Sequence, residues 1–167
     1  MVEFVAYDPE KHREQFFELN VAYFNYLNQL NLHNSGHKLL ENPHEYLESV
    51  FQTFSSIKPP EGIILLIMDA DNAVGMGTLR RLEYRVGEVK RMFIQPDFQG
   101  KGYGKLMMVR LMDKARELGY HTIRLDTGRM LEAAVHVYKS VGFREIAKYP
   151  GTESHGGPSY IYMEKSL

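Results

Sequence analysis

The feature that most constrains the fold is a glycine-rich segment past the middle of the chain. Gly100, Gly102 and Gly104 stand at alternate positions between an apolar run and a stretch with helical periodicity. Glycine adopts backbone conformations that other residues avoid, so this spacing predicts a tight loop that joins a strand to a helix. The first amides of a helix have no partner within it and lie at the positive end of the helix dipole. The segment therefore predicts either a site for a phosphate or a glycine turn that binds nothing.

The spacing of these glycines excludes two other phosphate loops. A dinucleotide-binding loop has glycines at its first, third and sixth positions, but the sixth residue from Gly100 is Lys105. A Walker A loop requires serine or threonine directly after Gly-Lys, but Leu106 follows Gly104 and Lys105. A phosphate at this loop would therefore be held mainly by backbone amides and the helix dipole.

Most of the chain before residue 60 is predicted to be helical. A short strand is expected at residues 2–7, and Asp8 followed by Pro9 is typical of a helix start. This first helix should end near residues 33–37, and its apolar residues recur at three and four positions, which predicts one buried stripe: Phe16, Leu19, Tyr23, Phe24, Leu27 and Leu30. A second helix is expected from Asn42, with Pro43 and Glu45 in its first turn, to a point before Lys58.

Beyond residue 60 the hydrophobic pattern changes to that of strands. Residues 62–96 contain short apolar segments separated by turns, which predicts an antiparallel meander. Two further helices are expected, one from Gly104 to about Leu118 and one within residues 130–141, each followed by a glycine. The remaining strands are expected at residues 122–127, 143–149 and 158–165.

Composition excludes several classes of function. The 20 basic and 21 acidic residues nearly cancel, so no bulk charge favours nucleic acid or an anionic membrane. The chain has no cysteine, which excludes disulfides, thiolate metal sites and a cysteine nucleophile. The longest apolar run is far too short to span a membrane and the first residues do not resemble an export signal, so a cytoplasmic protein is expected.

Two segments resemble one known family. Residues 99–104, Gln-Gly-Lys-Gly-Tyr-Gly, match the Gln/Arg-x-x-Gly-x-Gly/Ala signature of the GCN5-related N-acetyltransferases (GNAT), and residues 133–143 resemble the family's second signature, a helix with a tyrosine followed by Gly-Phe. The resemblance implies a single α/β domain over residues 1–167, with a mixed, mostly antiparallel central sheet and helices on both faces. It also implies transfer of an acetyl group from acetyl-coenzyme A (acetyl-CoA) to a primary amine by direct attack, without a metal.

The resemblance assigns the cosubstrate site residue by residue. The pyrophosphate of acetyl-CoA is expected at Gln99, Gly100, Lys101, Gly102, Tyr103 and Gly104, and the pantetheine arm along the backbone of Met92, Phe93 and Ile94. Those three side chains are equally suited to the core, and they can fill it while their backbone binds. One departure from the family lies at Leu131, where many members have an asparagine that contacts the pantetheine.

Two catalytic residues are implied in the same way. Glu88 matches the position of a catalytic glutamate and would take the proton of the amine, directly or through water. The alternative is a charged pair with Lys90 or Arg85 in an exposed strand. Tyr138 matches the tyrosine that protonates the departing thiolate, but its place in an apolar helical stripe is also typical of a core residue.

Other residues carry weaker predictions. His33 and His37 flank a helix-ending loop and are expected to be solvated rather than metal ligands. Asp126 could orient an amine or cap a turn. Tyr23 and Tyr26 on the first long helix are candidates for the acceptor pocket, with the core as the alternative. The glycine- and proline-rich segment 149–160 is expected to be mobile and to border that pocket.

The acceptor itself has no sequence signature. We expect the acceptor to be a small-molecule or peptide amine, and we expect no binding to nucleic acid or membrane. A homodimer is a possible assembly, because dimers are common in the resembled family. Two alternatives remain open at this point: a non-catalytic acyl-CoA sensor that uses the same loop, and a scaffold whose loop is empty.

Overall fold

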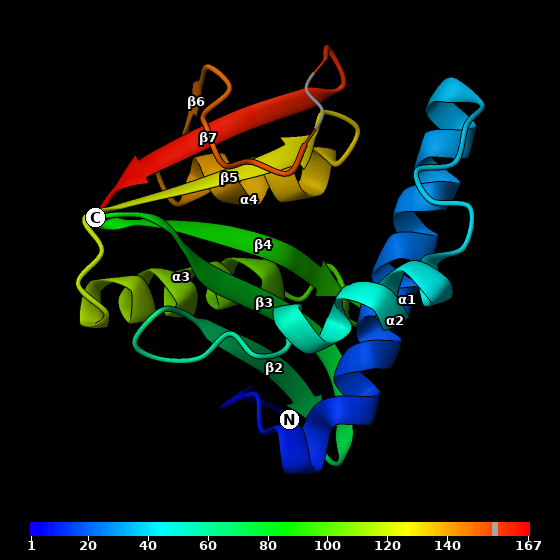
Figure 1. Ribbon diagram of the computed structural model, residues 1–167, viewed down its shortest axis with the longest axis horizontal. Helices are drawn as coiled ribbons and strands as arrows, with labels where there is room; N and C mark the ends of the chain where they lie inside the picture. The colour runs from blue at the N-terminus through cyan, green and yellow to red at the C-terminus, as the bar shows by residue number, and fades with distance from the viewer. Residues whose placement is uncertain (155–156) are drawn as a thin grey trace.

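The computed structural model describes residues 1–154 and 157–167. The elements along the chain are β1 (Val2–Ala6), α1 (Pro9–Ser35), α2 (Pro43–Phe54), β2 (Ile63–Asp69), β3 (Asn72–Glu83), β4 (Val86–Ile94), the 3₁₀ turn η1 (Pro96–Phe98), α3 (Tyr103–Glu117), β5 (Thr122–Gly128), α4 (Glu132–Ser140), β6 (Arg144–Ile146) and β7 (Tyr160–Ser166). Figure 1 shows their arrangement.

Local sequence signals define the ends of the first two helices. The Asp8 side chain accepts a hydrogen bond from the Glu10 amide at the start of α1, and the Asn42 side chain accepts one from the Glu45 amide at the start of α2. The first helix ends where Gly36 adopts a left-handed conformation, with φ 75°. These boundaries confirm the predicted caps.

The strands form one mixed sheet in the order β1-β2-β3-β4-β5-β7-β6. All neighbouring pairs are antiparallel except β4 and β5, which are parallel. The predicted meander corresponds to β2, β3 and β4, and the predicted fold class is confirmed.

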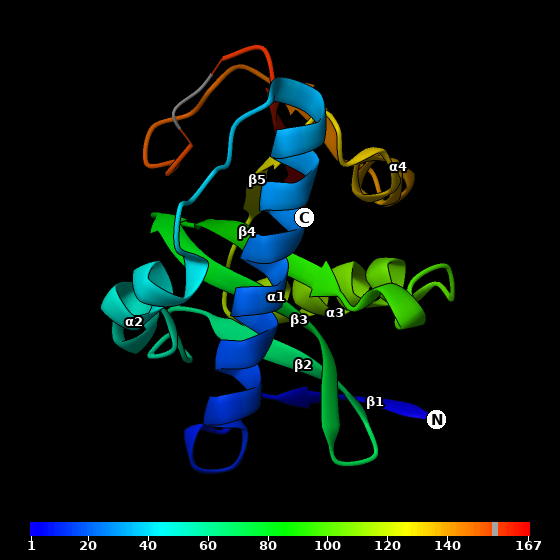
Figure 2. The same ribbon diagram turned by 90° about the vertical axis from the view of Figure 1, so that its right-hand side faces the viewer.

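Helices cover both faces of the sheet. One apolar cluster joins α1 and α2 to the sheet through Phe16, Leu19 and Phe51, and includes Leu66 and Phe93 from the strands. The opposite cluster contains five buried residues of α3 together with Tyr138 of α4: Met107, Met108, Leu111, Met112 and Ala115. In Figure 2, α2 and α3 lie on opposite sides of the strands.

The central strands β4 and β5 separate along their length. They pair only through Val86 with Thr122, Gly87 with Ile123 and Glu88 with Arg124. Beyond Glu88, β4 continues to Ile94 with β3 as its only neighbouring strand in the described part of the chain, while β5 continues to Gly128 paired with β7. The two strands therefore form a V that opens toward α1 (Figure 1).

A bulge interrupts β4 within this open part. Thr78 of β3 lies opposite Lys90 and Met76 lies opposite Phe93, so two residues of β4, Arg91 and Met92, occupy the space opposite one residue of β3. Arg91 has φ 51°, a left-handed conformation that is uncommon for a residue with a side chain. A bulge of this kind bends the strand and redirects side chains.

Candidate active site

The glycine loop follows β4 at the mouth of the V. Gly100 and Gly102 both have left-handed backbones, with φ 73° and φ 82°, and α3 begins at Tyr103, one residue earlier than predicted. The Gln99 side chain donates a hydrogen bond of 2.7 Å to the carbonyl of Ile94, which ties the loop to the end of β4. Sequence spacing therefore located this loop correctly.

The loop exposes backbone donors and leaves room for a ligand. Among the described residues, the amides of residues 100–105 donate to no carbonyl, and the first hydrogen bond of α3 runs from Leu106 to Gly102. A Cβ atom added at Gly100 or Gly102 would meet nothing within 4 Å, and the first turn of α3 contains no acidic residue. Unpaired amides at an open, positive helix end fit the pyrophosphate of a coenzyme.

The residues before the loop combine packing with an open backbone edge. Met92 and Ile94 pack against the α3 side of the sheet, and Phe93 is buried on the α1 side. Their backbone on the β5 side has no strand partner, because β5 has already separated from β4. Such an edge is a template for the amides of an extended ligand. The packing of these side chains in the core is confirmed, and the pairing of their backbone with a pantetheine arm stays a prediction.

Glu88 lies at the vertex of the V and is completely buried. Its Oε1 accepts a hydrogen bond of 2.7 Å from Nε of Arg80 and lies 3.8 Å from Nζ of Lys90. Its Oε2 accepts one of 2.8 Å from the hydroxyl of Tyr149. The charged pair with Lys90 that the structural alternative expected is therefore present, but it is buried rather than exposed, and the catalytic role of Glu88 stays a prediction.

Tyr149 is suited to donate to Glu88 at all ordinary pH values. Burial, followed by the neighbouring Glu88 carboxylate, raises the pKa of Tyr149 far above its usual value. The hydroxyl consequently keeps its proton, and the hydrogen bond to the carboxylate is charge-assisted.

Tyr138 lies within the helix layer, with 6% of its surface exposed. Its ring packs against Phe143 at 6.1 Å between centroids. Burial raises the pKa of Tyr138 well above its usual value, and Tyr23 and Asp126 add to this effect. The hydroxyl is therefore protonated at neutral pH, as a proton donor must be, while the ring also fills the core.

Two residues considered from the sequence, Tyr23 and Asp126, lie near this hydroxyl. Burial raises the pKa of Tyr23 to about 12, an effect that Arg91 opposes and Asp126 increases. The Asp126 side chain accepts a hydrogen bond from the hydroxyl of Thr152. The structure thus brings α1, β5, α4 and the segment after β6 together at the V.

Several residues of this site were not identified from the sequence. Arg80, Tyr149 and Glu153 all belong to the network around Glu88, since Glu153 lies 2.7 Å from Lys90 Nζ and 3.9 Å from Nη1 of Arg80. Arg80 lies directly opposite Glu88 on the neighbouring strand β3, whereas the contacts of Tyr149 and Glu153 join positions far apart in the chain, which no local spacing reveals. Residues 155–156 of the segment 149–160 lie outside the described residues, so the expectation of mobility there is not addressed.

The remaining sequence candidates lie outside the network around Glu88. His33 and His37 are exposed at the end of α1, and Tyr26 packs against Phe93 with 6.0 Å between ring centroids. Leu131 immediately precedes α4 and makes no side-chain capping bond, so it does not supply the contact of the family asparagine. Within the described residues, no group of three histidine or acidic side chains could hold a metal ion, and no helix is long and apolar enough to cross a membrane.

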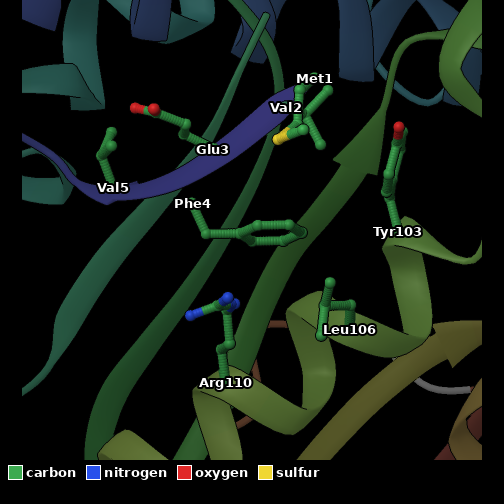
Figure 3. A pocket seen from close by; sticks show the side chains of 8 residues that line it. All are labelled: Met1, Val2, Glu3, Phe4, Val5, Tyr103, Leu106 and Arg110. Atoms are coloured by element: carbon green, nitrogen blue, oxygen red, sulfur yellow. The ribbon is translucent and has the colours of Figure 1, made fainter.

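A pocket of about 560 Å³ lies beside the outer strand β1. Figure 3 shows Phe4, Tyr103, Leu106 and Arg110 around it, and the Arg110 guanidinium lies 4.7 Å from the centre of the Phe4 ring. Because β2 and β3 separate β1 from β4, this pocket is remote from the network of Glu88.

Comparison with known proteins agrees with this geometry. The model of the acetyltransferase (GNAT) family matches residues 14–143. An uncharacterized N-acetyltransferase of Dictyostelium discoideum is 40% identical over 65 residues, which cover 39% of this chain and only 30% of that protein. The IAA acetyltransferase of Azospirillum brasilense is 28% identical over 138 residues, or 78% of this chain and 89% of that one.

The fold also matches a solved structure along its whole length. The crystal structure of the PaiA N-acetyltransferase of Thermoplasma acidophilum, in complex with coenzyme A, superimposes with a TM-score of 0.71 and covers 100% of this chain and 99% of that one. Its sequence identity to this chain is 16%, so the likeness concerns the fold alone.

Proposed function

This chain belongs to the GNAT acetyltransferase family, and from that premise we propose that it transfers an acetyl group from acetyl-CoA to a primary amine by direct attack. The observation that carries the proposal is the open edge of β4, which runs from the unpaired amides of the glycine loop back to the buried carboxylate of Glu88. A ligand bound along this edge would contact the anion-binding amides of the loop at one end and the titratable side chains around Glu88 at the other.

The residues that would hold the cosubstrate are those of the loop and the strand edge. The amides of residues 100–105 would bind its pyrophosphate, and the backbone of Met92, Phe93 and Ile94 would pair with the amides of its pantetheine arm. Gly104 faces Ile94 and Val137, at 3.7 Å and 4.0 Å from where a Cβ atom would lie. The bound thioester supplies the acyl group, and the protein supplies position and proton transfer.

The proposed reaction needs two proton transfers. The amine nitrogen attacks the thioester carbonyl, the carbon–sulfur bond breaks, and the departing thiolate takes a proton from the Tyr138 hydroxyl. The proton lost by the amine passes to Glu88. Because Glu88 is completely buried, a water molecule or the Tyr149 hydroxyl must relay this proton. Direct attack suits a chain without cysteine, which offers no thiol for an acyl-enzyme.

A non-catalytic acyl-CoA sensor is the second candidate, and one observation favours it. Both oxygens of Glu88 already accept hydrogen bonds, and Tyr138 packs in the core, so each residue has a sufficient structural role. In that case the loop binds the cosubstrate but no acetyl group is transferred.

Release of free thiol from acetyl-CoA in the presence of a panel of amines distinguishes the two. We expect release that depends on the amine, and we expect Glu88→Gln to lower turnover about a hundredfold or more while coenzyme A affinity is retained. Glu83→Gln is the matched control, since it removes a carboxylate of β3 that pairs with Arg124 and does not touch the site.

The outcomes separate the alternatives. Coenzyme A binding without thiol release for any amine supports the sensor, and failure to bind coenzyme A supports the empty scaffold. Equal turnover in Glu88→Gln and Glu83→Gln removes Glu88 from the mechanism. Three expectations stay predictions: that the acceptor is a small-molecule or peptide amine, that the protein forms a homodimer, and that it is cytoplasmic.

A further inference from the structure

A second pocket, of about 550 Å³, lies between α2 and the strands β3 and β4. Its wall includes Tyr46, Phe54, Arg80, Arg81, Arg91 and Glu153. Arg80 connects this pocket to the candidate active site, because its Nε atom donates to Glu88. A molecule in this pocket therefore lies one side chain away from the candidate base.

Arg91 reaches the pocket because of the bulge in β4. Its left-handed backbone, with φ 51°, directs the side chain to the face covered by α1 and α2. There Nη1 donates a hydrogen bond of 3.0 Å to Oδ1 of Asn20, and the guanidinium lies 3.7 Å from the centre of the Phe54 ring. An uncommon backbone conformation beside an active site is characteristic of a functional position.

In the described part of the chain, the charge of Arg91 is buried without a carboxylate in direct contact. Glu153 shares the pocket and acts on Arg91 electrostatically, but its carboxylate lies 2.7 Å from Nζ of Lys90. Only 9% of the residue Arg91 is exposed, and among the described residues no carboxylate forms a salt bridge with it.

The other two arginines of the pocket each form a salt bridge, Arg80 with Glu88 and Arg81 with Glu61. Burial also lowers the pKa of Arg91. A buried cation is costly unless an anion or several donors and acceptors surround it.

We propose, on the basis of the proposed function, that the acceptor is an amine that also carries a carboxylate, and that Arg91 binds this carboxylate. The planar guanidinium matches a carboxylate, and one unpaired positive charge balances one negative charge. Arg91 lies three residues from Glu88 on β4, a separation of about 10 Å or less along a strand. The amine and the carboxylate thus belong to a small molecule of the amino acid class.

Matched pairs of amines provide the test. Thiol release is measured with glycine, β-alanine, 4-aminobutyrate and the larger amino acids, each beside its methyl ester or amide. We expect wild type to prefer the free acid by about thirtyfold or more in kcat/KM, as for a buried charge pair. Arg91→Met should abolish that preference. Arg116→Met should keep it, since that half-exposed charge pairs with Asp113 and lies outside the pocket.

A binding measurement covers the case in which Arg91→Met does not fold. Calorimetry on wild type compares N-acetylated amino acids with their methyl amides, with coenzyme A present. Tighter binding of the acids supports the proposal, and equal binding of acids and amides overturns it. Equal kcat/KM for acids and esters in an active enzyme also overturns it. If no amine releases thiol, the proposed function fails, and the calorimetry still decides whether Arg91 binds a carboxylate.

Discussion

The hydrogen bond from Tyr149 to Glu88 gives a quantitative prediction for Tyr149→Phe. The ring of Tyr149 is 4% exposed and packs edge-on against Tyr162, with 5.8 Å between centroids. Phenylalanine retains this packing and removes only the hydroxyl, which donates to Oε2 of Glu88 at 2.8 Å. The substitution thus isolates one donor to a completely buried carboxylate.

The expected loss follows from the charge of the acceptor. Removing a hydrogen bond to a charged group costs about 1.5–3 kcal/mol, against about 0.5–1.5 kcal/mol for a neutral pair. For a chain of 167 residues this corresponds to a decrease in melting temperature of about 3–12 °C. Turnover should fall as well, because Tyr149 holds the candidate base in place.

Urea and thermal unfolding of the variant at neutral pH measure this loss. Tyr162→Phe is the matched control, since its hydroxyl shares a hydrogen bond with the neutral Ser154 side chain and the residue is similarly buried. If the two variants lose the same free energy of unfolding, Glu88 is not held as a charged, buried acceptor, and the assignment of the network is wrong.

Three further predictions concern the loop, the candidate acid and high pH. Lys105→Glu places a negative charge in the first turn of α3, which has no acidic residue, and should stabilise that turn by about 0.3–1 kcal/mol. The same substitution should weaken coenzyme A binding tenfold or more, and unchanged affinity by calorimetry would refute the phosphate site. Tyr138→Phe should lower turnover about a hundredfold, and less for acyl donors with a more acidic thiol, while a uniform loss with every donor would indicate positioning. Burial raises the pKa of Tyr23, Tyr138 and Tyr149, so the folded state holds their protons more tightly than the unfolded state. The contribution of these tyrosines to stability should therefore be constant below about pH 10 and fall above it, by up to about 1.4 kcal/mol per pH unit for each tyrosine. Stability that is flat from pH 10 to pH 12 would contradict their burial.

The elements of the fold were predictable where the signal is local. Asp8 and Asn42 each bond the amide of a residue two or three positions away, and the glycines after the helices adopt the left-handed conformation for which glycine is selected. The glycine loop belongs to the same class, because its residues are contiguous. For such contiguous residues, the number of positions between two residues also fixes how far apart they lie in the structure.

The network around Glu88 was not predictable for the opposite reason. Tyr149 is 61 positions from Glu88, and Arg91 is 71 positions from Asn20. The resemblance to the family identified Glu88 as a candidate but gave no information on these partners. Only the sheet order, which places the segment after β6 over β4 and β5, brings them together.

The bulge in β4 changes which side chains of this strand share a face. In a regular strand, alternate residues share a face, so Glu88, Lys90, Met92 and Ile94 would lie together. The bulge changes the phase at Arg91. Val89, Met92 and Ile94 pack on the α3 side, whereas Phe93 joins Arg91 on the side of α1 and α2.

Because of the bulge, the side chains next to the proposed coenzyme site and the side chain proposed to bind the acceptor lie on opposite faces of β4. The side chains of β4 that pack on the α3 side, next to the proposed coenzyme site, are apolar, and the cation that we propose for the acceptor lies on the opposite face, where Arg80 connects the pocket to Glu88. A regular β4 would turn Arg91 toward α3, where its charge would be buried among methionines and leucines. The left-handed conformation of one residue therefore accounts for both the apolar coenzyme side and the charged acceptor side of the same strand.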